Sequence, residues 1–171
     1  MRTRLLSVAA VQKHLQASGI GEPMAVAPYL TKLCDSLSQS MISGSRPISL
    51  EVVAGEGSLS TNHAVSIGLV VTEGVLNAIK HAFPADRSSA DCRIVVKYEV
   101  DGPNWMLSIA DNGVGKPEPG GVFQLKHGLG TSIVQALAQQ LAANVEVTTG
   151  ESGTTLALVH RGSNTAIPQA A

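Results

Sequence analysis

Apolar positions along the chain follow a helical period in some segments and a strand period in others, and each change of period marks a new element. The helical period predicts helices over residues 2–17, 27–43, 60–83 and 131–142. Runs of β-branched and other apolar residues predict strands over 48–53, 93–100, 105–110, 145–149 and 154–159. Short turns join the second strand of this series to the third and the fourth to the fifth, which predicts two antiparallel hairpins.

The segments between these elements contain the residues that end helices and form loops. The polar stretch 84–91 and the stretch 116–128, rich in Pro and Gly, predict surface loops, and we expect the second to be mobile. The small and polar residues from 161 to 171 have nothing to bury, which predicts a disordered tail. The chain shows no internal repeat and no sign of a second domain.

The helix predicted over 60–83 is apolar except for one narrow polar arc. Four polar residues lie at i, i+4, i+7 and i+8 and therefore share one stripe, namely Glu73, Asn77, Lys80 and His81. Burying such groups without partners is costly, so the stripe must face something polar. A solvated helix face meets this requirement. A metal-bound polyphosphate, which needs an amide or carboxylate oxygen and nearby cations, meets it as well.

Two glycine-containing segments could bind a ligand together with this helix. Asp111-Asn-Gly-Val-Gly115 places a carboxylate at a strand end, followed by glycines that permit tight turns. Gly128-Leu-Gly130 precedes a helix, where free backbone N–H groups can bind phosphate. Neither segment is specific alone, because Asp-Asn-Gly commonly forms a simple turn and Gly-x-Gly here lacks the preceding strand and third glycine of a dinucleotide fingerprint.

Composition and charge narrow the possible functions. The chain has 44% hydrophobic but only 3% aromatic residues, so its core is aliphatic, and its net charge of -1 argues against binding nucleic acid or a membrane surface through bulk charge. Cys34 and Cys92 have no metal-ligand spacing, which predicts free thiols and a cytoplasmic location. The apolar run after Met1 is too short for a signal peptide or membrane span, so we expect a soluble protein.

The order of the motifs is more specific than any one of them. Glu73-x-x-x-Asn77-Ala-x-Lys80-His81-Ala-Phe-Pro84, then Asp111-Asn-Gly113-Val-Gly115, Gly128-Leu-Gly130 and Gly153-Thr154, resembles the ATP-binding domain of bacterial sensor histidine kinases, within the gyrase/Hsp90/histidine-kinase/MutL superfamily. The residues that follow Asn77 and an upstream Tyr-Leu-x-x-Leu-Cys segment resemble the HisKA_2 type. The resemblance covers about residues 5–160. It implies a Bergerat-type α/β two-layer sandwich, with a mixed β-sheet covered on one face by helices and an N-terminal helix remnant in front.

The resemblance also implies a role for each matching residue. Asn77 would ligate the magnesium that bridges the ATP phosphates, and Glu73 would help proton movement or orient the attacking group. Asp111 would accept a hydrogen bond from the adenine amino group. Lys80 and His81 would contact the phosphates, and Thr154 would support the adenine from the neighbouring strand. Gly113 and Gly115 would let the backbone approach the base, and Gly128 and Gly130 would form the hinge of a lid over the phosphates. The ATP-binding positions also include Leu129 and Thr131.

The N-terminal part departs from the family pattern. HisKA_2 kinases carry the phosphoacceptor histidine on the first helix of a dimerisation hairpin, and this chain resembles that hairpin only from within its second helix. His14 lies on the helix remnant and is interpreted as a packing or surface residue. The expected organisation is a helical segment over 1–44, an ATP-binding catalytic domain over 45–160 and a tail over 161–171. A homodimer could form through the N-terminal helix.

Three functions follow from these observations. The first is the catalytic part of a two-component sensor histidine kinase, which would use ATP and magnesium to phosphorylate a histidine on a dimerisation helix outside this chain, for relay to a response regulator. The second is a stand-alone serine kinase of the anti-sigma-factor type. The third is a docking or phosphotransfer scaffold without nucleotide, which the retention of Glu73, Asn77, Asp111, Gly113 and Gly128 disfavours.

Overall fold

A computed structural model of the chain describes residues 22–42, 47–84, 92–115 and 129–162, with side chains in the last range described from residue 132 onward. The helix predicted over 2–17, the predicted loop over 116–128 and nearly all of the predicted loop over 84–91 and of the predicted tail lie outside these ranges.

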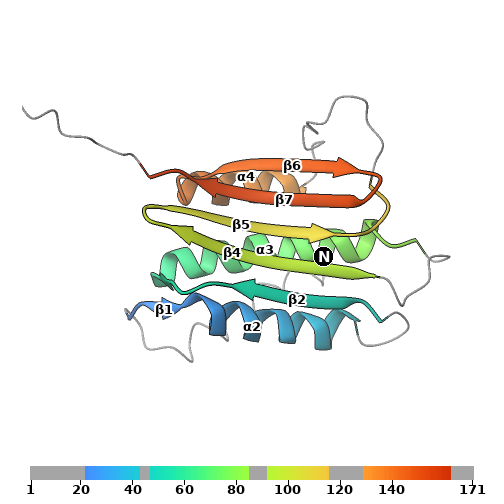
Figure 1. The fold of residues 1–171 in the computed structure, drawn as a ribbon, viewed down its shortest axis with the longest axis horizontal. Coiled ribbons are helices and arrows are strands. Elements are labelled where there is room, and N and C mark those ends of the chain that lie inside the picture. Colours follow the sequence, from blue (N-terminus) through green and yellow to red (C-terminus); the bar gives the residue numbers. More distant parts are fainter. Residues whose placement is uncertain (1–21, 43–46, 85–91, 116–128, 163–171) are drawn as a thin grey trace, which may run out of the picture.

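A five-stranded mixed sheet forms the centre of the structure (Figure 1). Its strands, in spatial order β2-β4-β5-β7-β6, are β2 (Ser49–Ala54), β4 (Arg93–Asp101), β5 (Asn104–Asp111), β7 (Gly153–His160) and β6 (Asn144–Gly150). β2 pairs with β4 in parallel, and the other neighbours pair antiparallel. Both predicted hairpins are therefore confirmed, as β4–β5 and β6–β7.

Two very short strands were not predicted from the sequence. β1 (Met24–Ala25) pairs antiparallel with β3 (Ser58–Leu59) and ties the start of the described chain to the segment before the long helix. Two residues are too few to show a period, so a pattern of alternation cannot reveal such strands.

The helices lie on one face of the sheet, as predicted (Figure 1). α3 (Thr61–His81) runs behind β4 and β5, α4 (Leu129–Gln140) lies behind β6 and β7, and α2 (Val26–Leu37) runs along β2 and continues as a π-helical turn over Ser38–Ile42. Ser60 caps α3 by accepting a hydrogen bond from the His63 N–H at 3.4 Å. The fold is therefore an α/β sandwich.

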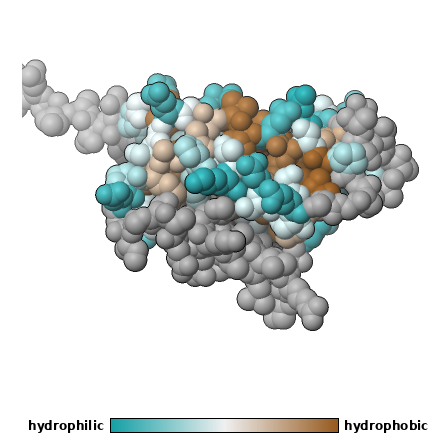
Figure 2. All heavy atoms as spheres, turned by 90° about the horizontal axis from the view of Figure 1, so that it is seen from below, coloured by the Kyte–Doolittle hydropathy of each residue, from teal (hydrophilic) through white to brown (hydrophobic). Residues whose placement is uncertain are grey.

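The core is aliphatic and lies between the helices and the sheet. Side chains from α2, α3 and alternate sheet positions join one buried cluster, including Leu30, Leu33, Ile67, Val70, Ile94, Val96, Leu107 and Leu158. On the side of α2 and β2, hydrophobic side chains also lie between hydrophilic ones at the surface (Figure 2), and Val53 of the edge strand β2 is half exposed. Because the buried side chains of α2 belong to the same cluster as those of α3 and the sheet, α2 packs together with them.

A glycine sets how closely α3 approaches the sheet. A Cβ atom at Gly74 would lie 3.2 Å from Cγ1 of Ile109 in β5, tighter than ordinary packing. Val70, Val71 and Val75 around Gly74 are fully buried. This close contact fixes the rotation of α3, which turns its polar arc away from the core.

Buried groups in α2 predict a loss of stability at alkaline pH. Burial, with a smaller contribution from Asp35, raises the pKa of the Cys34 thiol from 9.0 to about 12, and burial also raises the pKa of Tyr29, whose hydroxyl donates to the Ala64 carbonyl at 2.6 Å. Between pH 9.0 and about 12 the unfolded chain releases the Cys34 proton while the folded chain keeps it, so the free energy of unfolding falls as pH rises.

Replacing Cys34 with alanine is expected to flatten this pH dependence without removing it, since Tyr29 and Tyr98 also have raised pKa values. Urea unfolding under reducing conditions, at neutral pH and near pH 10, measures the effect. An unchanged slope in Cys34→Ala would contradict the assignment.

Candidate functional site

The polar residues of α3 lie together, as the helical period predicts. Glu73 is half buried, and Asn77, Lys80 and His81 are exposed, whereas Val71 and Val75 on the other side of the helix are buried. Lys80 and His81 occupy the last turn of α3, where the negative end of the helix dipole stabilises basic side chains. Exposure alone fits a solvated face as well as an open ligand site, so the surroundings of the stripe decide between them.

Asp111 ends β5 on the face of the sheet that the helices cover. It shares its side of the strand with the buried residues Leu107 and Ile109. Its Oδ1 atom accepts hydrogen bonds from the Gly113 N–H at 2.9 Å and the Thr154 N–H at 3.2 Å. The carboxylate thus connects the turn after β5 to the neighbouring strand β7, and both bonds hold the side chain in one orientation.

The turn after Asp111 is attached directly to the end of α3. The Val114 N–H donates to the Ala82 carbonyl at 2.7 Å, and a Cβ atom at Gly113 would overlap the Ala82 carbonyl group. Only glycine allows the two backbones to approach so closely. Ala82, which contacts this turn, directly follows Lys80 and His81 in the chain. The structure therefore brings the α3 motif and the Asp111 motif together.

The turn between β6 and β7 forms the third side of the site. A Cβ atom at Gly115 would overlap the Gly150 carbonyl, and one at Gly153, which has φ of +120°, would overlap the Asp111 carbonyl. Thr154 pairs with Asp111 across the sheet, and its hydroxyl lies 3.2 Å from that of Thr149. Gly115, Gly153 and Thr154 are thus brought beside Asp111, at the end of the sheet where β5 ends and β7 begins (Figure 1).

The predicted phosphate segment before α4 is described only in part. Gly128 lies outside the described residues, while Leu129, Gly130 and Thr131 form the first turn of α4, with side chains that are not described. α4 packs on α3, and the Ser66 hydroxyl donates to Oε1 of Gln140 at 3.4 Å. The roles assigned to Gly128 through Thr131 stay predictions.

Some residues that build the site were not singled out from the sequence. Asn112 bonds to the backbone of Arg93, Ala82 accepts from Val114, and Thr149 pairs with Thr154. Ala82 carries no chemical signal, because its backbone carbonyl makes the contact. Asn112 could have been noticed, since asparagine side chains often replace backbone hydrogen bonds at turns.

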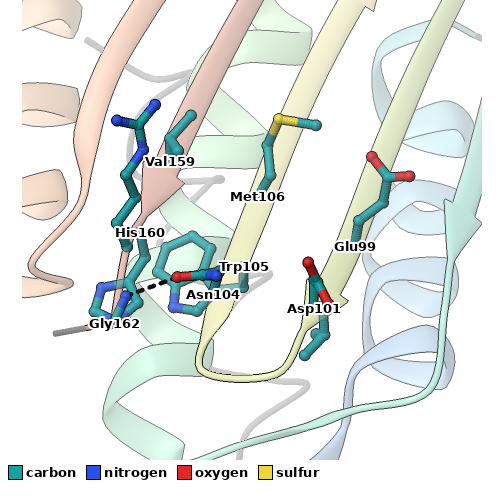
Figure 3. Close-up of a pocket in the computed structure, with 10 residues that line it drawn as sticks. Glu99, Asp101, Asn104, Trp105, Met106, Val159, His160 and Gly162 are labelled. Carbon is teal, nitrogen blue, oxygen red and sulfur yellow. Dashed lines mark hydrogen bonds between the residues drawn. The ribbon is translucent and has the colours of Figure 1, made fainter. Parts of the chain in front are cut away.

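A separate concave surface lies at the opposite end of β5 (Figure 3). It encloses about 640 Å³, with Met106 between the carboxylates of Glu99 and Asp101 on one side and Val159 on the other. Trp105 stacks between Tyr98 and His160, with ring centroids 5.9 and 5.5 Å apart. None of the predicted site residues that the structure describes lines this surface, so it is distinct from the candidate site.

Comparison with known proteins finds similar sequences and a matching family. The family model described as histidine kinase-, DNA gyrase B-, and HSP90-like ATPase matches residues 62–161, more than half of the chain. Blue-light-activated histidine kinase 2 of Erythrobacter litoralis is 32% identical over 126 residues, which cover 74% of this chain and 35% of that protein. Sensor histidine kinase PdtaS of Mycobacterium tuberculosis is 29% identical over 135 residues, covering 78% of this chain and 26% of the relative.

The fold is also shared with a solved structure. The histidine kinase domain of the Erythrobacter litoralis EL346 blue-light-activated histidine kinase superposes with a TM-score of 0.76 at 26% identity, covering 93% of this chain and 78% of that one. The chain therefore spans most of a histidine kinase domain but only 35% and 26% of the two curated relatives. In the described part of the chain, no helix is both long and apolar enough to cross a membrane.

Proposed function

This chain belongs to the histidine kinase-, DNA gyrase B- and HSP90-like ATPase family and is an ATP-binding domain of the sensor histidine kinase kind, and from this premise we propose that it transfers the γ-phosphate of ATP to a histidine outside the chain. The phosphohistidine would then pass its phosphate to a response regulator. The observation that carries the proposal is the direct attachment of the Asp111 turn to the end of α3, through the Val114 N–H and the Ala82 carbonyl at 2.7 Å.

The adenine end of the nucleotide is assigned to the sheet side of the site. Asp111 is held by the N–H groups of Gly113 and Thr154, so its carboxylate is oriented before a ligand arrives. A carboxylate accepts a hydrogen bond from the adenine amino group more strongly than a neutral acceptor does. Gly113 and Gly115 keep the backbone close to the base, and Thr154 supports it from β7. In this proposal, these placements would select adenine.

The phosphate end is assigned to the exposed stripe of α3. Lys80 and His81 supply cationic or hydrogen-bond-donating groups within one turn of the Asp111 loop, and Asn77 lies one turn earlier. A single exposed amide oxygen fits magnesium, which keeps most of its waters and otherwise binds phosphate oxygens. When bound, magnesium would neutralise charge on the phosphates. Gly128, Leu129, Gly130 and Thr131 would close over the phosphates at the start of α4.

The protein residues act on the transfer by position and charge. Lys80 stabilises negative charge that develops on the transferred phosphoryl group, which is the main demand of this chemistry. Glu73, half buried one turn before Asn77, orients the attacking imidazole or takes its proton. Because His81 is assigned to the phosphates in this proposal, the acceptor histidine would approach the exposed end of α3 from outside the chain.

The remaining parts of the assembly are proposals of the same kind. Residues 1–44 would connect this domain to a dimerisation helix of the HisKA_2 type, residues 45–160 would form the catalytic domain, and 161–171 would be a tail. A homodimer would form through the N-terminal helix.

Titration with ATP and ADP, with and without magnesium, tests the nucleotide site. We expect saturable binding that magnesium strengthens, and Asn77→Ala should remove most of the magnesium effect because it lacks the amide oxygen. Asn62→Ala, at an exposed position at the other end of the same helix, serves as the matched control. Nucleotide affinity that changes neither with magnesium nor with Asn77→Ala would contradict the assignment of Asn77. If a folded chain does not bind nucleotide at all, the scaffold function is favoured.

The acceptor is tested by incubating the chain with radiolabelled ATP and separate candidate substrates. Transfer to a dimerisation-helix fragment that contains the histidine, giving an acid-labile product, supports the proposed function. An acid-stable product on a serine-containing partner would instead support the serine-kinase alternative.

A further inference from the structure

The hydrogen-bond ladder between β4 and β5 is closed by a side chain. The last paired residues are Ile94 and Asp111. One position further, the Asn112 N–H donates to the Arg93 carbonyl at 3.2 Å, and Oδ1 of Asn112 accepts from the Arg93 N–H at 2.8 Å. In a regular antiparallel pair, that second N–H would donate to the backbone carbonyl of the opposite residue. The amide oxygen of Asn112 therefore takes the place of its own backbone carbonyl.

This substitution lets the backbone leave the sheet without losing a hydrogen bond. Immediately after Asn112, the chain turns toward α3, where Gly113 lies against Ala82 and the Val114 N–H donates to the Ala82 carbonyl at 2.7 Å. If the side-chain oxygen were absent, the Arg93 N–H would compete for the backbone carbonyl of residue 112. Satisfying it would extend the strand and draw the turn away from α3.

We propose that Asn112 is a positioning residue for nucleotide binding, which sets the place of Asp111 and Gly113 by ending β5 at the correct residue. The inference rests on the proposed function, in which Asp111 receives the adenine. Asn112 bonds to the backbone of Arg93 and not to its side chain, whose Nε lies 3.5 Å from Oε1 of Glu51 on an exposed part of the sheet. In this proposal, Asn112 acts on the ligand through the turn that it holds.

The same strand offers a matched control at its other end. Oδ1 of Asn104 accepts a hydrogen bond from the Gly162 N–H at 3.0 Å, shown as the dashed line in Figure 3. Asn104 begins β5 and Asn112 follows its last residue, so the same residue type makes the same kind of bond at both ends. Asn104→Ala removes such a bond far from Asp111.

The test compares ADP binding by the wild-type chain, Asn112→Ala, Asn112→Asp and Asn104→Ala, with urea unfolding of each. Asn112→Ala should weaken ADP binding by about tenfold, the effect of losing one hydrogen bond that orders a binding loop. Asn112→Asp keeps the acceptor oxygen and should recover most of the affinity at high salt, which screens its added charge beside Asp111. Asn104→Ala should bind ADP as the wild-type chain does, even where its stability falls.

Two results would overturn the inference while leaving the nucleotide site intact, provided that Asp111→Ala abolishes binding. One is wild-type affinity in Asn112→Ala. The other is an equal loss of affinity in Asn112→Ala and Asn104→Ala, which would reduce the effect to general stability. If the folded wild-type chain does not bind ADP at all, the proposed function fails and the role of Asn112 fails with it.

Discussion

Replacing Asp111 with asparagine is expected to lower ATP affinity by about 100-fold while leaving the fold intact, which corresponds to the loss of one charge-assisted hydrogen bond. The asparagine oxygen can still accept from the N–H groups of Gly113 and Thr154, which lie 2.9 and 3.2 Å from Oδ1 of Asp111 in the wild-type chain. Its amide nitrogen, however, is a donor and would face the donor amino group of adenine. Calorimetric titration measures the affinity, and urea unfolding checks stability.

Base selectivity separates this effect from general damage to the site. Guanine presents a carbonyl oxygen where adenine presents its amino group, so an asparagine donor at position 111 should lose far less affinity for GTP than for ATP. The ratio of ATP to GTP affinity should therefore fall in Asp111→Asn. An equal loss for both nucleotides would contradict a direct contact between Asp111 and the base.

Replacing Gly113 with alanine is expected to abolish nucleotide binding and to destabilise the fold by about 2–3 kcal/mol, the cost of forcing a methyl group into a packed contact. The new Cβ would overlap the Ala82 carbonyl, so the turn would have to move away from α3 and break the 2.7 Å bond from the Val114 N–H. The phosphate and adenine parts of the site would then separate. Urea unfolding and ADP titration measure the two effects.

Gly150→Ala provides the control for this substitution. Gly150 lies in the β6–β7 turn of the same site, but a Cβ atom there would meet nothing within 4 Å. The added methyl group should leave stability unchanged or raise it by up to about 1 kcal/mol, because alanine restricts the unfolded chain more than glycine does. If both substitutions destabilise equally, the close contact at Gly113 does not explain its effect.

The contact between the end of α3 and the turn after Asp111 also explains how the proposed binding residues are distributed. Asn77, Lys80 and His81 are exposed on α3, and the buried contact of Gly74 with Ile109 holds that helix against β5. Asp111 lies two residues after Ile109 on the same strand and the same face. One strand therefore both supports the helix and carries the carboxylate, so the two halves of the site cannot shift independently.

Much of the local structure follows from the order of residues alone. The period of apolar positions predicted α2, α3 and α4 and all five strands of the main sheet, with both hairpins, because these patterns depend on neighbours within one or two turns. The same period placed Glu73, Asn77, Lys80 and His81 on one stripe. Resemblance to a family then joined this stripe to Asp111. The match over residues 62–161 confirms the family, and the roles of these residues stay predictions.

Contacts between distant segments required the folded chain. The parallel pairing of β2 with β4, the short β1–β3 pair, the bond from Val114 to Ala82 and the closure of the ladder by Asn112 join residues that no local period relates. A backbone carbonyl such as that of Ala82 looks the same in every residue, so its partner depends on where packing brings the chain. Local patterns therefore specify which side chains share a face, and long-range packing specifies which faces meet to form the site.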